Sequence, residues 1–240
     1  MDFFDRKDPD QPDFSRHTIK PLADRMRPQT LDQMFGQEKV VGPGTPLRKA
    51  IEADRVSSLI FWGPPGSGKT TLASVIARTT RGQFVPFSAV TSGIKEVKAV
   101  LSKAGNYYEL SGRRTYVFID EIHRFNKAQQ DAFLPYVEKG DIVLIGATTE
   151  NPSFEVISAL LSRVKVYTLE RLSETDLKKI IEMALSDTER GLAELNITIE
   201  EKAIDFIVSA ADGDARRALN FLEAAASDIG KDGRITLEKA

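Results

Sequence analysis

The chain has 240 residues, enough for one large domain or for a domain with a smaller companion, and its apolar and charged fractions are those of a globular protein. Lysine and arginine number 33 against 35 aspartate and glutamate, so the net charge of −2 provides no global basic field for nucleic acid. The absence of cysteine excludes disulfides, cysteine-ligated zinc and thiol catalysis, and two histidines are too few for a histidine-rich metal site.

Residues 1–19 are charged, contain two prolines and show no sustained hydrophobic period, which predicts a mobile tail. Its aromatic residues Phe3, Phe4 and Phe14 are either a docking peptide for a partner or ordinary aromatics that lie loose or pack on the domain. The acidic N-terminus is unlike a signal peptide, and no apolar run approaches the length of a membrane span. We therefore expect a cytoplasmic protein with no membrane partner.

The next segment, residues 21–41, combines prolines that fix the backbone with apolar side chains. Those apolar side chains are Leu22, Ala23, Val40 and Val41. Such a segment can wall an adenine ring while backbone groups read the edge of the ring. Spacing alone predicts only an irregular loop here.

Residues 63–70 read Gly-Pro-Pro-Gly-Ser-Gly-Lys-Thr and fit G-x-x-x-x-G-K-[ST], the phosphate-binding loop of nucleoside triphosphatases. A strand-like apolar run precedes the loop, and a helical period follows it. Gly63, Gly66 and Gly68 are expected to allow turns closed to other residues, so that consecutive N–H groups face the phosphates at a helix N-terminus. The pattern predicts a nucleotide site rather than a plain turn.

Within this loop, Lys69 is predicted to reach the β- and γ-phosphates, and the Thr70 hydroxyl is predicted to bind Mg²⁺. The nucleotide-binding residues predicted for the loop are Gly63, Pro64, Pro65, Gly66, Ser67, Gly68, Lys69, Thr70 and Thr71.

Three elements are predicted after the loop helix. Residues 84–87 form a short strand, which Pro86 places at a sheet edge. Residues 94–104 have one apolar face and form a helix. Residues 115–119 are continuously apolar, which predicts a strand buried on both faces.

That last strand ends in Asp120 and Glu121. A carboxylate at such a strand end beside a phosphate loop can hold Mg²⁺ through its water shell, which is the role predicted for Asp120. Glu121 can polarise and orient the attacking water. The alternative is an acidic pair that ends a strand or caps a helix. His123 has either a local hydrogen-bonding role or a catalytic one.

Residues 126–167 predict a helix, a strand, a helix and a strand in turn, over 126–140, 141–147, 153–161 and 164–167. The first helix opens on a capping box from Asn126 to Gln129. The strand after it ends in Thr148 and Thr149, and a polar residue there can hold the water between the γ-phosphate and Glu121. Two threonines at a strand end are also common through β propensity alone.

From Leu169 onward the predicted elements are helices only, which predicts one domain over 20–168 and a small helical bundle over 169–240. Two of its helices follow the caps Ser173-x-x-Asp176 and Thr198-x-x-Glu201, and a third follows Gly213. Thr236 resembles the cap of a helix that has scarcely begun, so we expect the sequence to be part of a longer protein.

Together these features resemble an AAA+ ATPase, an α/β P-loop NTPase with a parallel sheet sandwiched by helices and followed by a helical-bundle lid. The motifs that resemble the clamp-loader clade are Arg25-Met26-Arg27-Pro28, Gly36-Gln37, residues 63–71, Ser162-Arg163 and residues 213–220. Residues 120–127 and 146–153 are most like the replication-associated recombination protein A family, RarA or MgsA, to which the Werner-helicase-interacting proteins belong. The resemblance covers about residues 20–240.

The resemblance implies several site roles. Thr149, or else Thr148, is sensor 1, Arg163 is the arginine finger that enters a neighbouring subunit's site, and Arg216 is sensor 2 from the lid. Each arginine is otherwise a surface salt-bridge residue. The further nucleotide-binding residues implied are Leu22, Arg25, Gln37, Val40, Val41 and Asp120. This chain departs from the pattern at Ser88, where an Asn or Asp often switches the catalytic glutamate, and at Val164, which replaces a cysteine.

The implied activity is DNA-stimulated ATP hydrolysis with Mg²⁺, in replication-fork maintenance, recombination and repair. The implied partners are DNA forks, junctions or ends, single-stranded-DNA-binding protein, and identical subunits in a tetramer, at the nucleoid. The alternatives are a clamp-loader subunit, a Holliday-junction branch-migration motor, and an ATP-dependent scaffold that recruits replication proteins. A small-molecule kinase fits less well, because the acidic pair and the lid arginine suit hydrolysis better.

Overall fold

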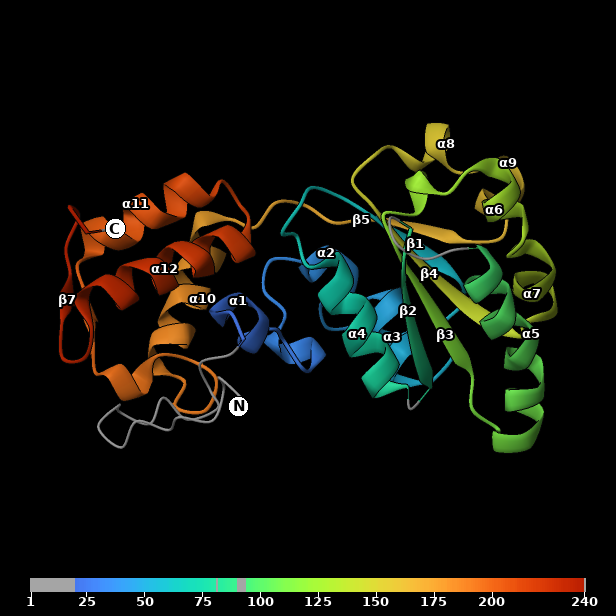
Figure 1. Cartoon of the computed structure of the whole chain (residues 1–240), viewed down its shortest axis with the longest axis horizontal. Coiled ribbons are helices and arrows are strands. Elements are labelled where there is room, and N and C mark those ends of the chain that lie inside the picture. Colours follow the sequence, from blue (N-terminus) through green and yellow to red (C-terminus); the bar gives the residue numbers. More distant parts are fainter. Residues whose placement is uncertain (1–19, 81, 90–93, 240) are drawn as a thin grey trace, which may run out of the picture.

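The structure, a computed structural model, describes residues 20–80, 82–89 and 94–239, so Phe3, Phe4 and Phe14 lie outside the described residues. A five-stranded parallel sheet forms its larger part, in the order β2-β3-β4-β1-β5 (Figure 1). The strands are β1 (Leu59–Trp62), β2 (Gln83–Ser88), β3 (Thr115–Asp120), β4 (Ile142–Thr148) and β5 (Lys165–Thr168). The predicted α/β class is confirmed, and β2 lies at a sheet edge as Pro86 indicates.

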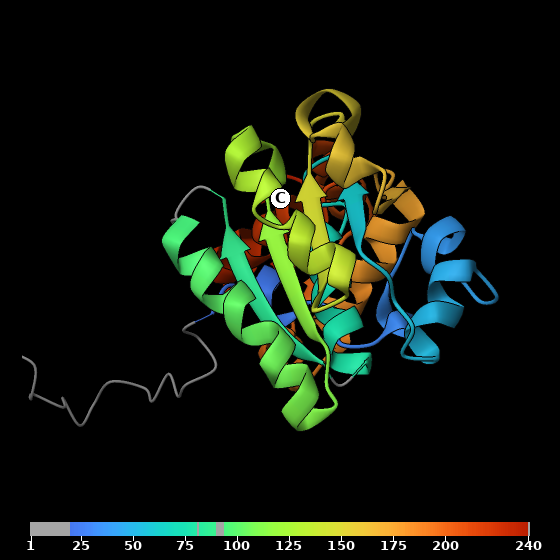
Figure 2. The same cartoon turned by 90° about the vertical axis from the view of Figure 1, so that its right-hand side faces the viewer.

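Helices cover both faces of the sheet, because its central strands are apolar on both sides. Every residue of β4 is buried, and its side chains are divided between two apolar clusters. Figure 2 looks onto the sheet through α5 and α7, with the C-terminal helices behind. The helices of this part are α2 (Glu38–Val41), α3 (Pro46–Glu52), α4 (Lys69–Thr79), α5 (Ile94–Ser111), α6 (Lys127–Asp131), α7 (Leu134–Lys139), α8 (Pro152–Glu155) and α9 (Ser158–Leu161), with short 3-10 turns η1 (Leu31–Gln33) and η2 (Ile122–Arg124).

The helix predicted over 126–140 is divided into α6 and α7. Its capping box at Asn126 and Gln129 is confirmed, and Gly140 ends α7 with a φ of 76°. The division falls just before Pro135, which has no N–H to donate and whose ring crowds the carbonyl of the preceding turn.

The C-terminal part, here called the lid, is a bundle of α10 (Glu174–Ser186), α11 (Glu201–Ala211) and α12 (Ala215–Ile229) beside the turn η3 (Ala193–Leu195). The capping box at Ser173 and Asp176 is confirmed. The prediction of helices only is wrong, because β6 (Thr198–Ile199) pairs in parallel with β7 (Arg234–Ile235). Thr198 therefore lies in a strand, and the N-cap of α11 is Glu200, two residues later.

The short helix α1 (Leu22–Arg25) belongs to the lid in space, although the sequence assigned it to the first domain. Leu22 and Met26 are buried in the apolar cluster of α10, α11 and α12 (Figure 1). The Leu22 N–H donates to Glu223 Oε1 of α12 at 2.9 Å. Helix α1, from the start of the described chain, therefore packs in the lid together with α10, α11 and α12 from its C-terminal part.

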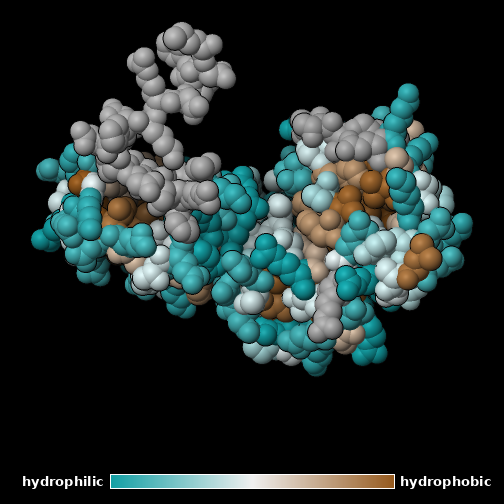
Figure 3. Space-filling view, turned by 60° about the horizontal axis from the view of Figure 1, so that its bottom comes forward, coloured by the Kyte–Doolittle hydropathy of each residue, from teal (hydrophilic) through white to brown (hydrophobic). Residues whose placement is uncertain are grey.

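Figure 3 shows a hollow between the lid and the sheet-containing part, bordered mainly by hydrophilic residues. The chain crosses between the two parts after residue 26 and again after β5. Across the described ranges, no helix combines the length and apolar character that a membrane crossing requires.

Candidate active site

The phosphate-binding loop lies between β1 and α4, at the carboxyl end of the sheet. Gly66 and Gly68 have φ values of 70° and 95°, a region that favours glycine, and Gly68 is the N-cap of α4. Gly63 does not have a positive φ; it is required for another reason. A Cβ at Gly63 would lie 2.3 Å from the carbonyl oxygen of Leu169, so the constraint there is close packing rather than backbone conformation.

Lys69 is held against its own loop. Its Nζ donates to the carbonyl oxygens of Gly63 and Pro64, each at 2.8 Å, and the residue is 7% exposed. Burial lowers the pKa of Lys69, while the negative charges of Glu121 and Asp120 oppose this shift. The ammonium group is therefore desolvated and lies in the field of the two acidic residues at the end of β3.

The lid contacts this loop directly. A Cβ on Gly66 would lie 2.0 Å from Asp214 Oδ1, so the Asp214 carboxylate packs on the Gly66 backbone. The same carboxylate caps α12 by accepting from the N–H groups of Arg216 and Arg217. The Asp214 side chain thereby caps α12 and also contacts the phosphate-binding loop at Gly66.

We expect Gly66→Ala to weaken nucleotide binding more than backbone strain alone would. The methyl group must displace Asp214, whereas Gly140→Ala imposes a similar left-handed φ of 76° in open space. Each substitution carries a strain of about 1 kcal/mol, so Gly140→Ala is the matched control. Titration with a fluorescent ATP analogue and thermal unfolding of both variants test this. Equal affinities in the two variants would show that the lid contact does not contribute.

A cavity opens between the loop and the lid, and residues 66–71 form one of its walls. The opposite wall is apolar, as an adenine ring requires. The apolar residues that line it are Ala23, Met26, Pro28, Met34, Phe35, Leu172, Ile180, Met183, Ala215 and Leu219. Every methionine after Met1 lies in this wall, which suits a flat ligand because methionine side chains adapt their shape.

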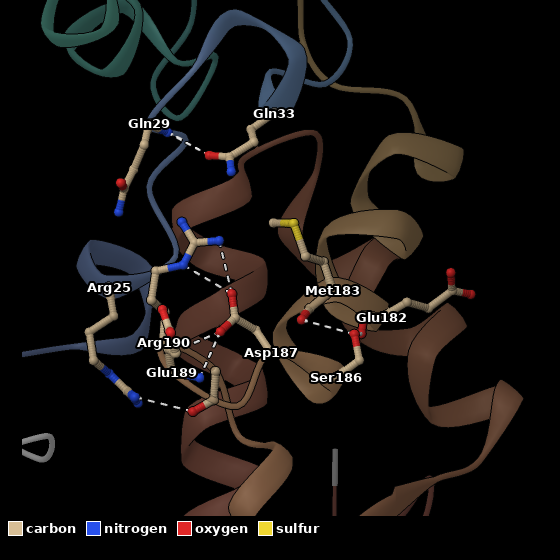
Figure 4. Close-up of polar contacts among 10 residues, drawn as sticks. Arg25, Gln29, Gln33, Glu182, Met183, Ser186, Asp187, Glu189 and Arg190 are labelled. Carbon is tan, nitrogen blue, oxygen red and sulfur yellow. Dashed lines mark hydrogen bonds and ion pairs between the residues drawn. The ribbon is translucent and has the colours of Figure 1, made fainter. Parts of the chain in front are cut away.

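All five nucleotide-binding residues predicted between residues 20 and 41 lie outside the lining of this cavity, as do the predicted Gly63, Pro64, Pro65 and Asp120. Leu22 is in the lid core, and Val40 and Val41 are buried in the cluster between α2, α3 and the sheet. Arg25 donates through Nη1 to the carbonyl oxygen of Gly191 at 3.1 Å and so fastens α1 to the lid (Figure 4). In and beside helix α1, Ala23 and Met26 line the cavity, whereas the predicted Leu22 and Arg25 do not.

Gln37, the fifth of these residues, is 4% exposed, and its side-chain amide joins three parts of the chain. Its Nε2 donates to the carbonyl oxygens of Ser67, at 3.3 Å, and of Glu170, at 2.9 Å. Its Oε1 accepts from the Glu170 N–H at 3.2 Å. The amide therefore ties the phosphate-binding loop to the segment that leads into the lid.

The acidic pair lies at the end of β3. Asp120 is the last residue of the strand, and Ser88 of β2 is its neighbour in the sheet register. Glu121 follows with a φ of 54°, an unusual conformation for a residue other than glycine. Such strained backbone is concentrated at functional sites, where it aims a side chain.

The two threonines at the end of β4, Thr148 in the strand and Thr149 directly after it, have different contacts. Thr148 is fully buried, and its hydroxyl is bonded to the backbone of Glu150. Thr149 is partly exposed, and its Oγ1 lies 3.5 Å from Glu121 Oε2. The geometry therefore favours Thr149 over Thr148 as the residue that shares a water molecule with Glu121.

The two candidate arginines lie in different places. Arg216 lines the cavity from the start of α12 and influences the pKa of Lys69. Arg163 is not among the residues that line it. Its Nη2 forms an ion pair with Glu138 Oε1 at 2.6 Å, and its Nη1 donates to the carbonyl oxygen of Ala159. Its side chain is 39% exposed.

Two family models match the chain: the ATPase family associated with various cellular activities (AAA) over residues 59–172, and the AAA C-terminal domain over residues 193–240. Replication-associated recombination protein A of Escherichia coli K12 is 52% identical and that of Haemophilus influenzae 49% identical, each over 88% of this chain and 47% of the relative. This chain thus spans about half the length of these curated relatives.

A solved structure of the Thermotoga maritima RuvB Holliday junction branch migration motor has the same fold. Its TM-score is 0.72 at 30% sequence identity, and the match covers 90% of this chain and 70% of that one.

Proposed function

Because the chain belongs to the AAA family of ATPases and resembles replication-associated recombination protein A over most of its length, we propose that it binds and hydrolyses ATP in replication-linked recombination and repair. The observation that carries this proposal is the convergence of Lys69, Glu121 and Thr149 at the carboxyl ends of β1, β3 and β4. In open parallel sheets, ligands bind outside these strand ends.

ATP enters with its base against the methionine-rich wall and its phosphates on the N-terminus of α4. Lys69 exchanges two carbonyl partners for phosphate oxygens. Mg²⁺ is usually held by one or two protein groups, waters and substrate phosphates. Thr70 and Asp120 would hold it, and it would neutralise phosphate charge.

Glu121 accepts a hydrogen bond from the attacking water and polarises it, while Thr149 fixes the water from the next strand. Arg216 approaches the phosphates from the lid of the same subunit, so closure of the lid and neutralisation of charge occur together. Arg163 acts on the site of a neighbouring subunit.

Lys69→Ala is expected to weaken ATP binding by about 30-fold to about 4,000-fold, the range for removing one partner of a desolvated charge pair. Isothermal titration with ATP and Mg²⁺ measures the change. Lys39→Ala, which removes an exposed lysine paired with Glu170, is the control and should bind ATP like the parent. Equal affinity of the Lys69→Ala variant and the parent would remove Lys69 from the site.

We propose DNA forks, junctions or ends as the polymer partner, because the names of the relatives link them to replication and recombination. Single-stranded-DNA-binding protein, a homotetramer and a location at the nucleoid belong to the same proposal. The likeness to RuvB favours one second candidate, a Holliday-junction branch-migration motor.

Measurement of the ATPase rate on forked, four-way-junction and plain duplex DNA tests these proposals, with Glu121→Gln as the background control. Stimulation by forks supports fork maintenance, and stimulation by four-way junctions alone supports the second candidate. A parent protein that binds ATP yet never exceeds the Glu121→Gln rate would contradict the ATPase proposal.

A further inference from the structure

We propose that His123 is a positioning residue that holds the carboxylate of Glu121 in the orientation needed to polarise water. The inference deepens the proposed ATPase function and rests on it. The sequence leaves two roles open for His123, local hydrogen bonding or catalysis, and the proposal gives it a defined positioning role.

The backbone after β3 brings His123 back over Glu121. Glu121 adopts a left-handed conformation, and the turn η2 then closes with the Arg124 N–H donating to the Glu121 carbonyl oxygen at 2.9 Å. Ile122, inside the turn, is fully buried and anchors it in the core. The backbone of His123 is therefore fixed by the turn and by the burial of Ile122.

The imidazole joins the tips of two strands. His123 Nδ1 lies 3.2 Å from Glu121 Oε2, which follows β3, and 2.9 Å from Thr148 Oγ1, at the end of β4. The His123 side chain is 16% exposed and that of Glu121 is 31% exposed. Within the part of the chain that the structure describes, the Glu121 carboxylate has one other side-chain hydrogen bond, the long one from Thr149 Oγ1 at 3.5 Å.

The donors and acceptors around His123 can be assigned from their chemistry. An ionised carboxylate only accepts hydrogen bonds, so the nitrogen that faces Glu121 must carry a proton. The Thr148 hydroxyl has one proton, which it donates to the carbonyl oxygen of Glu150 at 3.2 Å. Thr148 Oγ1 accepts from the Glu150 N–H at 3.0 Å and can also accept from His123. We therefore assign a proton to Nδ1, which places it between Thr148 Oγ1 at 2.9 Å and Glu121 Oε2 at 3.2 Å.

In this arrangement the buried Thr148 and its neighbour Thr149 have separate roles. The Thr148 hydroxyl orients the His123 imidazole, and the imidazole orients the Glu121 carboxylate. Without the Nδ1–H, the flexible glutamate side chain loses its closest partner and samples other rotamers, so fewer encounters align the water. ATP binding is unaffected, because His123 does not line the cavity.

Substitutions that keep or remove the donor test the proposal. Asparagine carries its amide nitrogen near the position of Nδ1, whereas glutamine carries it one bond farther out. We expect His123→Ala and His123→Gln to lower kcat for ATP by about 10- to 100-fold, the range for losing a hydrogen bond to a charged group. KM for ATP should not change, and His123→Asn should recover most of kcat. In a Glu121→Gln background, His123→Ala should have no further effect.

Parental kcat in His123→Ala would overturn the proposal. An equal loss in the asparagine and glutamine variants would also overturn it, because the donor position would then be irrelevant. A loss that appears as raised KM or lowered melting temperature in all three variants would indicate a purely structural role and reject positioning.

A second measurement does not depend on hydrolysis. The sequence has only two histidines, His17 and His123, so the spectrum of His123→Asn assigns both imidazoles in nitrogen NMR. In its neutral form, we expect the His123 imidazole to be the Nδ1–H tautomer. In Glu121→Ala this preference should be lost, because Thr148 can then donate to Nδ1. An Nε2–H tautomer in the parent would refute the assignment.

These results separate the two proposals. If the parent shows no ATPase activity but His123 has the expected tautomer, the function is wrong and the contact is right. If the parent hydrolyses ATP, Glu121→Gln does not, and His123→Ala hydrolyses it at the parental kcat, the function stands and the positioning role fails.

Discussion

Replacing Arg163 by alanine is expected to lower the ATPase rate per protomer by about 10³-fold or more while ATP affinity stays unchanged. The guanidinium contacts Glu138 and Ala159 and does not line the cavity of its own chain, so the proposed role requires that it act on another copy. The parental rate per protomer should then rise with protein concentration. A rate that is fast and independent of concentration would contradict this assignment.

Control variants sharpen the test. Arg171→Ala removes an exposed arginine that is paired with Asp212 in the lid, and it should retain the parental rate. Glu138→Gln removes the negative charge paired with Arg163 but keeps the guanidinium, and it is expected to keep or raise the rate. Loss of activity in Arg171→Ala equal to that in Arg163→Ala would indicate a general effect of surface charge.

Mixing two inactive variants gives a direct measurement of sharing between subunits. Arg163→Ala retains a complete site without a finger, and Glu121→Gln retains the finger beside a disabled site. If the finger acts between subunits, the mixture should hydrolyse ATP although neither variant does so alone. A mixture as inactive as its components, in samples shown to co-assemble, would mean that Arg163 does not act in trans.

Replacing Glu121 by glutamine is the second large expected effect, a fall in kcat of about 10²- to 10⁴-fold. The amide keeps the size and hydrogen-bonding reach of the carboxylate but cannot accept a proton from water. ATP affinity should remain at the parental value or rise slightly, since removing a negative charge beside the phosphates reduces repulsion.

Phosphate release under saturating ATP, combined with equilibrium titration of ATP, measures both quantities for Glu121→Gln. Glu109→Gln, an exposed glutamate on α5, is the matched control and should behave like the parent. Turnover by Glu121→Gln at the parental rate would show that another group activates the water.

Several features were predictable because their signals are local in sequence. The loop with Gly66, Gly68 and Lys69 depends on backbone freedom and charge within eight residues. The capping boxes at Asn126 and Ser173 join residues three apart, and the buried strands are short apolar runs. Membership of the AAA family followed from such motifs, and the comparisons confirm it.

Other features depended on contacts between distant parts of the chain. The amide of Gln37 is bonded to Glu170, 133 positions later, and α1 packs against α12. No periodicity in the sequence indicates which face of a four-residue helix meets a domain almost two hundred residues away. For that reason Leu22 and Arg25 were assigned to the cavity, whereas Ala23 and Met26 line it.

The sequence alone therefore determined the family of this protein and the chemistry proposed for it, because the residue types that bind phosphate and polarise water are few and occur in short motifs. Only the tertiary structure decided which side chains line the cavity, that Thr149 rather than Thr148 lies against Glu121, and that His123 bridges the two strand tips. These relations arise where separate strands end at one edge of the sheet, and the distance between such ends is set by strand order and register.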